Sequence, residues 1–406
     1  MKRIQLFYFT PADLLIPRVD RQCIMRFLDA LAQRGVVVEA VSLDVKVDFE
    51  EPTRERDLFD VYGLTMRFPV RILPSRTRQS RDNVNPVWRM LVFSAYAYWR
   101  LLVRRRSSPS DITVLYFKNY LLAAPFLLLR RLLRGKLLLL FEIHVPPERI
   151  RDRRLIRRLD GLVPVSSILA RELQADYDID ERRILVAHQG VDLDAISRVV
   201  GENGDLRERL GLPTDRKLAV YTGKVNDRLR EIDFMLEAAR LVPETELVIV
   251  GGREDEVARL RARVRREGPA NVRFEGFVAP ADIFPYQAAA DVLLTYYSSE
   301  LSINKYRASP GKLFEYMASG RPIVTADYPA LREALSPGAA LFVEPDNPAA
   351  LAEGIRTVLA DPELGDRLAQ QARADVQRFT WDKRAERVIE FVHHLHALEH
   401  EKTRAG

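Results

Sequence analysis

The chain has 406 residues, of which 47% are apolar and 30% are charged. This length suits two domains, and the composition is that of a globular protein, which excludes disorder over most of the chain. The formal net charge is +6, and the excess of basic residues lies before residue 196. The sole cysteine, Cys23, excludes an intramolecular disulfide framework and a cysteine-based zinc site.

The start of the chain fits a first β-strand better than a signal peptide. Its apolar run is short and stops at Thr10 and Pro11. No apolar run approaches the roughly 18 residues that a membrane-spanning helix needs. We therefore expect a cytoplasmic protein without an integral membrane segment.

The first half alternates short β-rich runs with amphipathic segments. Strands are predicted, in chain order, at Ile4–Phe9, Val36–Leu43, Ile112–Phe117, Leu137–Ile143 and Gly161–Val165. Helices are predicted near 18–34, 86–106, 121–134, 151–158 and 167–176. The run Ile184–Ala187 is expected to close this sheet, and Gly201–Gly204 has the composition of a linker.

The second half repeats the alternation. Strands are predicted at Lys217–Thr222, Glu246–Val250, Val272–Phe274, Val292–Thr295, Ile323–Thr325 and Ala340–Val343, with late helices at 348–360, 363–378 and from Trp381 to about Glu401. This pattern predicts an α/β fold of two Rossmann-like domains with parallel sheets, over 1–200 and 201–380. The helix at 381–406 is expected to pack back on the first domain.

The most informative motif runs from Ser309 to Val324. Ser309 is a good N-cap and Pro310 suits the first helical position, while Gly320 and Pro322 end the helix. The helix start then offers free N–H groups to a phosphate, those of Gly311, Lys312 and Leu313. Further along, Glu315 could accept two hydrogen bonds from a ribose diol. The alternative is an ordinary amphipathic helix whose Lys312 and Glu315 are solvated.

Several residues after predicted strands are further candidates, because ligands of such sheets bind beyond the carboxyl ends of the strands. Gly223 lets a backbone approach a ligand, and Lys224, Arg228 and Arg230 can neutralise phosphate. The pair Gly276 and Phe277 could present backbone groups to a base edge, although glycines at such turns are common without a ligand.

Histidines occur in two contexts. His144 follows the strand Leu137–Ile143, so we expect it at the carboxyl edge of the first sheet, facing the cleft between the domains. Four more lie near the end of the chain, and two of these, His396 and His400, are one helical turn apart and could bind a metal. A solvated terminal helix is the favoured interpretation of that second group.

Arginines of the first half cluster near apolar and aromatic segments, at 104–106, 130–134 and 149–158. Such a mixture suits an anionic membrane surface or a lipid-phosphate substrate, although solvated arginine faces without a ligand are equally common. No helix-turn-helix, zinc finger or aromatic single-strand platform is found, so we expect no nucleic-acid partner.

With these motifs assembled, the chain resembles the retaining GT-B glycosyltransferases of the family-4 type. The second half carries LAVYTGKV, LVIVGGRED, NVRFEGFV, AADVLLTYY and SPGKLFEYMASGRPIV in the order of that family, and the first half carries FEIHV, PVSSILARELQADY and HQGVDLDAI. The resemblance implies that Glu315 holds the donor ribose and that the N–H groups of Gly311 to Leu313 touch the diphosphate. It also implies that Lys224 and Arg230 stabilise the leaving group and that His144 contacts the donor sugar.

The chain departs from the family in three places. The family's second glutamate, eight residues before the ribose-binding one, corresponds to Arg307, so either Arg307 or a neighbour would read the sugar differently, or the donor is unusual. Thr10–Asp13 stands where a Gly-Gly loop is usual. The expected lysine-glycine pair appears as Arg230 and Glu231.

The resulting expectation is a retaining transferase that moves a sugar from a nucleoside-diphosphate donor to a carbohydrate or lipid-linked acceptor in cell-surface polysaccharide or glycolipid synthesis. We expect no cofactor and no metal, and a peripheral position at the inner face of the cell membrane is one possibility. Two alternatives stay open. One is a non-catalytic sugar-nucleotide-binding or scaffold subunit, and the other is a nucleotide-sugar epimerase or hydrolase on the same architecture.

Overall fold

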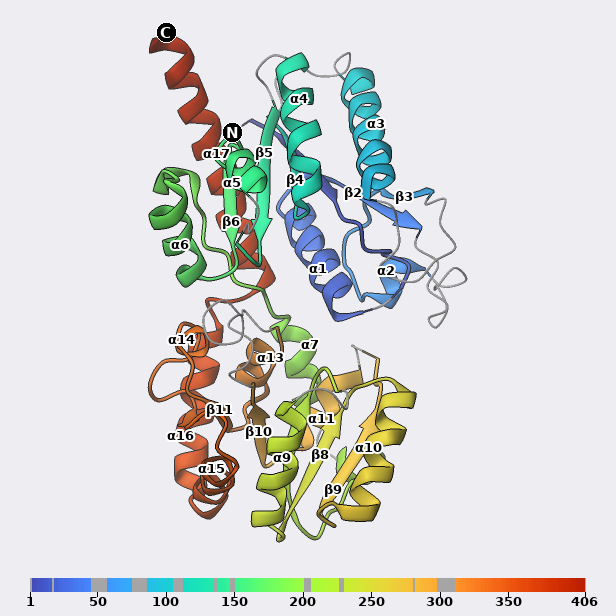
Figure 1. The fold of residues 1–406 in the computed structure, drawn as a ribbon, viewed down its shortest axis with the longest axis vertical. Helices are drawn as coiled ribbons and strands as arrows, with labels where there is room; N and C mark the ends of the chain where they lie inside the picture. The colour runs from blue at the N-terminus through green and yellow to red at the C-terminus, as the bar shows by residue number, and fades with distance from the viewer. Residues whose placement is uncertain are drawn as a thin grey trace. The chain divides into compact units, whose positions relative to one another are not determined.

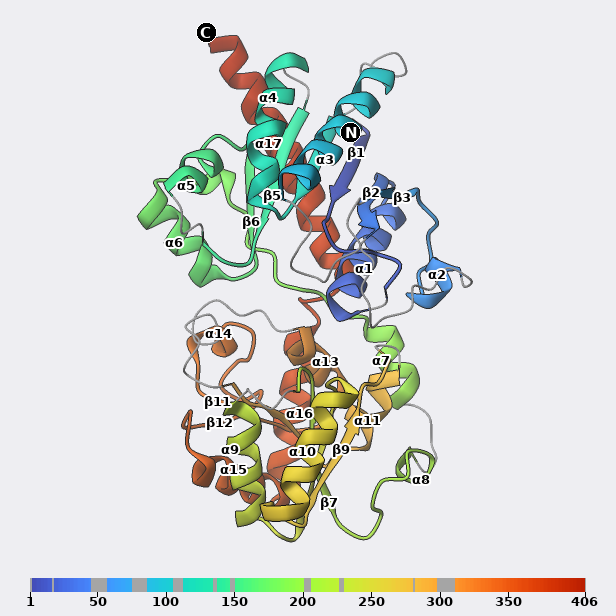
Figure 2. The same ribbon diagram turned by 45° about the vertical axis from the view of Figure 1, so that its right-hand side comes forward.

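The computed structural model describes residues 2–16, 18–44, 57–74, 86–104, 112–133, 137–146, 150–200, 206–225, 230–279, 282–297 and 311–405. The chain forms two compact units, each an α/β layer structure (Figures 1 and 2). The first unit contains residues 1–188 and 381–406, and the second contains 189–380.

The first unit is built on a parallel sheet with the strand order β3-β2-β1-β4-β5-β6. Its strands are β1 (Ile4–Phe9), β2 (Val37–Asp44), β3 (Val70–Pro74), β4 (Ile112–Phe117), β5 (Leu137–Ile143) and β6 (Gly161–Pro164). Its helices are α1 (Val19–Gln33), α2 (Leu58–Val61), α3 (Pro86–Arg104), α4 (Ala123–Leu133), α5 (Ile150–Ile156), α6 (Ser167–Tyr177) and α17 (Trp381–Ala405), with short 3-10 turns at Tyr120–Leu122 and Glu181–Arg183.

Alternation along the buried strands decides which helices cover which face of this sheet. In β1, Leu6 and Tyr8 pack in one cluster with residues of α1 and α17, whereas Phe7 and Phe9 pack in another with residues of α3, α4 and α6. Successive side chains of a strand point to opposite faces, so both faces are covered and all of β1 is buried. The helix α17 therefore completes one face of the first sheet, from the far end of the sequence.

The second unit repeats the design with the strand order β12-β11-β10-β7-β8-β9, again all parallel. Its strands are β7 (Lys217–Thr222), β8 (Thr245–Val250), β9 (Val272–Gly276), β10 (Val292–Thr295), β11 (Ile323–Ala326) and β12 (Leu341–Val343). Its helices are α7 (Leu193–Val200), α8 (Leu206–Arg209), α9 (Arg230–Leu241), α10 (Glu254–Glu267), α11 (Ile283–Ala289), α13 (Gly311–Ser319), α14 (Pro329–Arg332), α15 (Pro348–Ala360) and α16 (Pro362–Val376).

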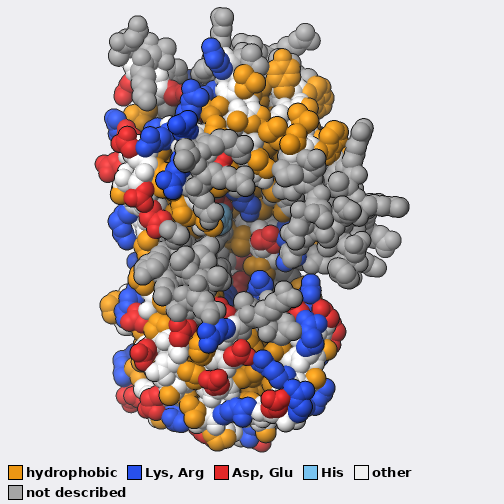
Figure 3. Space-filling view, viewed as in Figure 1, with side chains coloured by type: hydrophobic (Ala, Val, Ile, Leu, Met, Phe, Trp, Pro, Cys, Tyr) orange, Lys and Arg blue, Asp and Glu red, His pale blue; other side chains and the backbone are white. Residues whose placement is uncertain are grey.

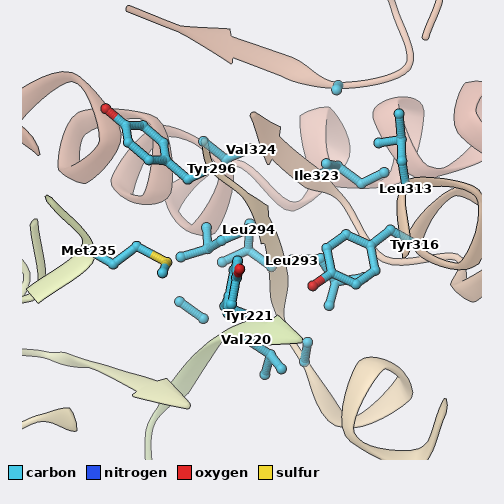
Figure 4. Close-up of a cluster of buried hydrophobic side chains, with 14 of the residues drawn as sticks. Val220, Tyr221, Met235, Leu293, Leu294, Tyr296, Leu313, Tyr316, Ile323 and Val324 are labelled. Atoms are coloured by element: carbon cyan, nitrogen blue, oxygen red, sulfur yellow. The ribbon is translucent and has the colours of Figure 1, made fainter. Parts of the chain in front are cut away.

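The core of the second unit joins the central strands to α9 and α13. Figure 4 shows Met235 of α9 on one side of Leu294 and Tyr316 of α13 beside Leu293. All four side chains are fully buried or nearly so. This packing fixes the start of α13 relative to the strand ends around it.

Three details differ from the sequence-based expectation. The edge strand β3 was not predicted, and the run at 184–187 adds to β6 only through an isolated bridge and two backbone hydrogen bonds. The boundary between the units lies after His188, so the predicted first domain of 1–200 is too long. The reason is that Val191 and Ile196 belong to the core of the second unit.

Candidate functional site

The carboxyl edge of the second sheet gathers most of the candidate residues. Gly223 and Lys224 follow β7, Gly276 ends β9, and α13 begins at Gly311. The strands are parallel, so their carboxyl ends share one edge, where doubly wound sheets bind their ligands. These residues form the candidate donor site.

Lys312, in the first turn of α13, is the central cation of this site. Its Nζ atom lies 3.9 Å from the centre of the Tyr221 ring and 4.8 Å from that of Tyr297. Burial lowers the pKa of Lys312 to about 7, although Glu231 and Glu315 act in the opposite direction. The charge of Lys312 therefore titrates near neutral pH and responds to any anion that binds beside it.

Gly223 provides the space in which the Lys312 ammonium lies. A Cβ atom at position 223 would stand 3.0 Å from Lys312 Nζ and 3.2 Å from the Tyr221 hydroxyl. The φ angle of Gly223 is +152°, and that of Gly251, which follows β8, is +124°. A Cβ on Gly251 would come within 1.9 Å of the Gly223 carbonyl oxygen. The two loops thus approach each other through glycines, whereas the predicted approach of Gly223 to a ligand stays a prediction.

Glu315 lies one helical turn after Lys312 and is held in place by a hydrogen bond from α11. Its Oε2 atom accepts a hydrogen bond of 2.9 Å from Nε2 of Gln287, a fully buried residue of α11. Burial raises the pKa of Glu315, while the hydrogen bond from Gln287 and the charge of Lys312 oppose that rise. In α13 the next residue, Tyr316, places its hydroxyl 2.7 Å from the backbone nitrogen of Thr222. The helix is thereby fixed to the end of β7.

Glu231 is a residue of this site whose side chain the sequence-based interpretation gave no role. It lies in the first turn of α9, is 6% exposed, and acts electrostatically on Lys312 and on the rings of Tyr221 and Tyr297. The feature of the sequence that pointed to Glu231 is the replacement of the family's lysine-glycine pair by Arg230 and Glu231. The electrostatic effect of Glu231 on Lys312 was not predictable, because the two residues lie on helices that are distant in the sequence.

The remaining predicted donor-site residues have varied settings. Lys224 and Arg230 are exposed, and the Arg230 guanidinium lies 5.6 Å from the centre of the Phe234 ring. The side chain of Leu313 is fully buried, so only its backbone can face a ligand. Gly276 has a φ of +81° and Phe277 is 67% exposed. The predicted residues Arg228, Arg307 and Pro310, and the proposed cap Ser309, lie outside the described residues.

His144 belongs to the first unit, so the structure does not group it with the donor-site residues. It directly follows β5, and its Nε2 atom lies 2.7 Å from Oε1 of Glu142. Its side chain is 41% exposed. The predicted place of His144, at the carboxyl edge of the first sheet, is confirmed.

The terminal histidines lie on α17 and include His396, whose Nε2 atom is 3.3 Å from Lys2 Nζ. Over the described part of the chain, no group of three or more His, Cys, Asp or Glu side chains is arranged to hold a metal ion. The terminal histidines therefore form no such group there.

Comparison with known proteins agrees with this geometry. Residues 22–195 match the model of Glycosyltransferase Family 4, and residues 216–361 match that of Glycosyl transferases group 1. A D-inositol 3-phosphate glycosyltransferase of Xylanimonas cellulosilytica is 30% identical over 252 residues, which are 59% of this chain and 58% of that protein. The chain thus spans little more than half the length of this relative.

Solved structures show the same fold. A glycosyltransferase from Rickettsia africae superimposes with a TM-score of 0.74 and 15% identity, covering 97% of this chain and 99% of that one. Anabaena HepE, solved in complex with UDP and glucose, superimposes with a TM-score of 0.68 and 17% identity. The match covers 95% of this chain and 98% of that one. With a family match in each half, this chain belongs to the GT-B glycosyltransferases of family 4 and group 1.

Proposed function

We propose that this protein is a retaining glycosyltransferase that moves a sugar from a nucleoside diphosphate to a carbohydrate or lipid-linked acceptor. Its biosynthetic setting would be cell-surface polysaccharide or glycolipid. The observation that carries the proposal is the start of α13, where Lys312 and Glu315 lie one turn apart at the carboxyl edge of the sheet. A cation and a helix N-terminus suit a diphosphate, and a carboxylate suits a ribose diol.

The reaction explains why cations belong at this edge. As the bond from the anomeric carbon to the diphosphate oxygen breaks, its electron pair leaves with the diphosphate, and negative charge grows there. Lys224, Lys312 and Arg230 stabilise that charge more than they stabilise the intact donor, which is the requirement for catalysis. The acceptor oxygen then bonds to the anomeric carbon, and its proton passes to the departing phosphate.

These cations can act on the leaving diphosphate without a divalent ion, and we propose that none is needed. His144 would contact the donor sugar, as the family resemblance implies. The complex of HepE with UDP and glucose makes uridine nucleotides the first donors to test. The relative from Xylanimonas cellulosilytica is named for D-inositol 3-phosphate, so this compound is one acceptor to include.

A thermal-shift screen of the purified protein tests donor binding. It uses UDP, GDP, ADP, CDP and their common sugar conjugates without added metal. A ligand that binds only the folded protein raises its melting temperature. We expect a shift with one nucleoside diphosphate and loss of that shift in Glu315→Ala. No shift with any nucleotide would contradict the proposed site.

Turnover separates the enzyme from its alternatives. With the donor identified, release of nucleoside diphosphate is followed with and without acceptors. Release that depends on an acceptor supports a transferase. Consumption of the donor without an acceptor supports a hydrolase or epimerase, and donor binding without any consumption supports a scaffold subunit. Lys224→Ala should lower kcat about 100-fold with the fold intact, the usual effect of removing one group that stabilises developing charge.

We also propose that the first unit rests on an anionic membrane surface. Side chains of α3 and α4 form an exposed apolar surface that is visible in Figure 3. It comprises Val87, Leu91, Tyr98, Trp99 and Leu128, each at least 44% exposed. Neither helix contains an acidic residue, and the exposed Arg131 lies in the last turn of α4, next to Arg130, which is paired with Asp160. Aromatic, apolar and basic side chains together favour an anionic lipid surface.

Liposome sedimentation tests this surface. None of the described helices is long and apolar enough to cross a bilayer. We expect the protein to bind vesicles with anionic lipid at low salt and to bind neutral vesicles more weakly. The double variant that combines Leu91→Glu and Trp99→Glu should lose this binding. The matched control is Leu241→Glu, at an exposed leucine of the second unit. Equal sedimentation of all variants would contradict the proposal. It would also be contradicted if the wild-type protein formed a dimer that only the variants of α3 dissociate, because the apolar surface would then be a contact between two copies of the chain.

A further inference from the structure

His144 is held by a buried hydrogen-bonded cluster that no sequence motif indicated. Glu142, two residues earlier on β5, is 5% exposed, and its Oε1 atom lies 2.7 Å from His144 Nε2. Its Oε2 atom accepts hydrogen bonds from the Tyr116 hydroxyl at 2.7 Å and from Arg384 Nη2 at 2.8 Å. Both oxygens of the carboxylate are therefore engaged, and neither can turn freely.

The cluster keeps Glu142 ionised. Burial alone would raise the pKa of its carboxyl, but Arg384 and His144 hold that pKa well below its usual range. An ionised carboxylate can only accept hydrogen bonds, so the nitrogen of His144 that faces it must carry a proton. When the imidazole is neutral, its other nitrogen, Nδ1, is then the one with the free lone pair.

Arg384 links this cluster to the end of the chain. It is 5% exposed on α17, and its Nη1 atom donates to the carbonyl oxygens of Ala187 and His188. On the other side of His144, the Tyr120 hydroxyl donates to the Val145 carbonyl oxygen at 2.6 Å. The backbone before His144 is held by the pairing of β5 with β6 up to Ile143, and the backbone after it by Tyr120, while the imidazole stays 41% exposed.

We infer that Glu142 and Arg384 are positioning residues that fix His144 with Nε2 protonated and present Nδ1 to a sugar hydroxyl. The hydroxyl donates its hydrogen to Nδ1 of the neutral ring. This inference rests on the proposed role of His144 at the donor sugar. It assigns a function to the C-terminal helix beyond packing, because Arg384 supplies the charge that keeps the Glu142 carboxylate ionised and in place.

Nuclear magnetic resonance of the wild-type protein gives a direct test. The six histidines of the chain are labelled with ¹⁵N, and the signals of His144 are identified by their loss in His144→Asn. We expect the neutral ring of His144 to carry its proton on Nε2. A neutral ring protonated on Nδ1 would overturn the inference, and this result does not depend on any enzyme activity.

Kinetics give a second test that separates positioning from general damage to the fold. Glu142→Gln should lower kcat about 10- to 100-fold, as expected for a residue that orients a functional histidine, with a much smaller change in KM. In the His144→Ala background the same substitution should have little further effect, because the two residues act through one group. Equal effects in both backgrounds would overturn the inference.

The design also distinguishes this inference from the proposed function. If His144→Ala leaves turnover unchanged, the role of His144 at the donor is wrong, whatever the tautomer. If Glu142→Gln does not fold, Tyr116→Phe removes one hydrogen bond to the carboxylate without unpairing a charge. Its kcat should fall by a smaller factor, and again only when His144 is present; a fall of the same size in His144→Ala would contradict positioning.

Discussion

The ammonium group of Lys312 lies on the face of the Tyr221 ring, 3.9 Å from its centre, in the first turn of α13. The cation is therefore held against an aromatic surface, partly removed from water and close to the strand end where a ligand would bind. Burial lowers the pKa of Lys312 to about 7, and the negative charges of Glu231 and Glu315 offset only part of that shift.

Donor binding should therefore take up a proton. A bound diphosphate favours the charged form of Lys312, so its pKa rises from about 7 in the free protein. Affinity for a nucleoside-diphosphate sugar should fall as the pH rises above 7, by up to about tenfold per pH unit. Calorimetry in buffers of different ionisation enthalpy measures both effects. Lys312→Met should bind weakly at every pH, and Lys217→Met, at the opposite end of β7, should behave as the wild type.

Glu315→Ala should weaken nucleoside-diphosphate binding about 10- to 100-fold, the value of hydrogen bonds to a charged acceptor. Glu315→Gln should lose less, because it keeps one acceptor and the shape of the side chain. Titration calorimetry at constant pH measures the affinities. The control is Glu353→Ala, at an exposed glutamate of α15. Unchanged affinity in Glu315→Ala would refute a ribose contact.

Gly251→Ala should destabilise the second unit by at least about 2 kcal/mol. The new Cβ would stand 1.9 Å from the Gly223 carbonyl oxygen, and φ at this position is +124°. Differential scanning calorimetry measures the loss. Gly338→Ala is a suitable comparison, because its Cβ would meet no atom closer than 3.6 Å. A melting temperature that falls no further in Gly251→Ala than in Gly338→Ala would show that the backbone relaxes.

Arg384→Met should destabilise the first unit by about 3 to 5 kcal/mol at neutral pH, because it leaves the buried Glu142 carboxylate without its cation. The three tryptophans are Trp88, Trp99 and Trp381, all in the first unit, so their fluorescence during urea unfolding reports on that unit alone. Arg332→Met, which breaks an exposed pair with Asp327, should cost at most about 1 kcal/mol.

The substitution Arg384→Met should also change how the stability of the first unit responds to acid. The folded pKa of Glu142 lies below its ordinary value of 4.5, so its contribution to wild-type stability is present above that pH and lost as the pH falls below it. Without Arg384, burial should raise this pKa, and protonation would then relieve the variant. The difference in stability between wild type and Arg384→Met should shrink between about pH 6 and pH 4. A constant difference would contradict the assigned charge pair.

Elements with a strong local pattern could be predicted from the sequence. The strands Ile112–Phe117 and Leu137–Ile143 have the predicted bounds because both are apolar runs, interrupted only by Thr113 and Glu142, that are buried on both faces. The edge strand Val70–Pro74 was missed because it is short, includes Arg71 and Pro74, and has no fully buried residue. Edge strands have one partner and a weaker hydrophobic signal.

The candidate sites were predictable only in part. The positions of Lys312, Glu315 and His144 followed from turn chemistry and strand ends. Their surroundings did not, because Gln287 and Tyr221 reach Glu315 and Lys312 from other elements of the fold, and Arg384 reaches the Glu142 carboxylate beside His144. Glu142 was part of a predicted strand, and its pairing with Arg384 spans 242 residues of sequence. A single sequence contains no signal for such a contact.

The order in which the chain is made gives the helix α17 one further consequence. The first unit is left at His188 and completed only from Trp381 onward, so the ribosome makes residues 189–380 in between, on the order of 10 to 40 s at typical rates. During that time the sheet face with Leu6 and Tyr8 lacks its last helix and Glu142 lacks its cation. The second unit can fold first, and the nascent first unit exposes apolar surface for chaperones until the final residues emerge.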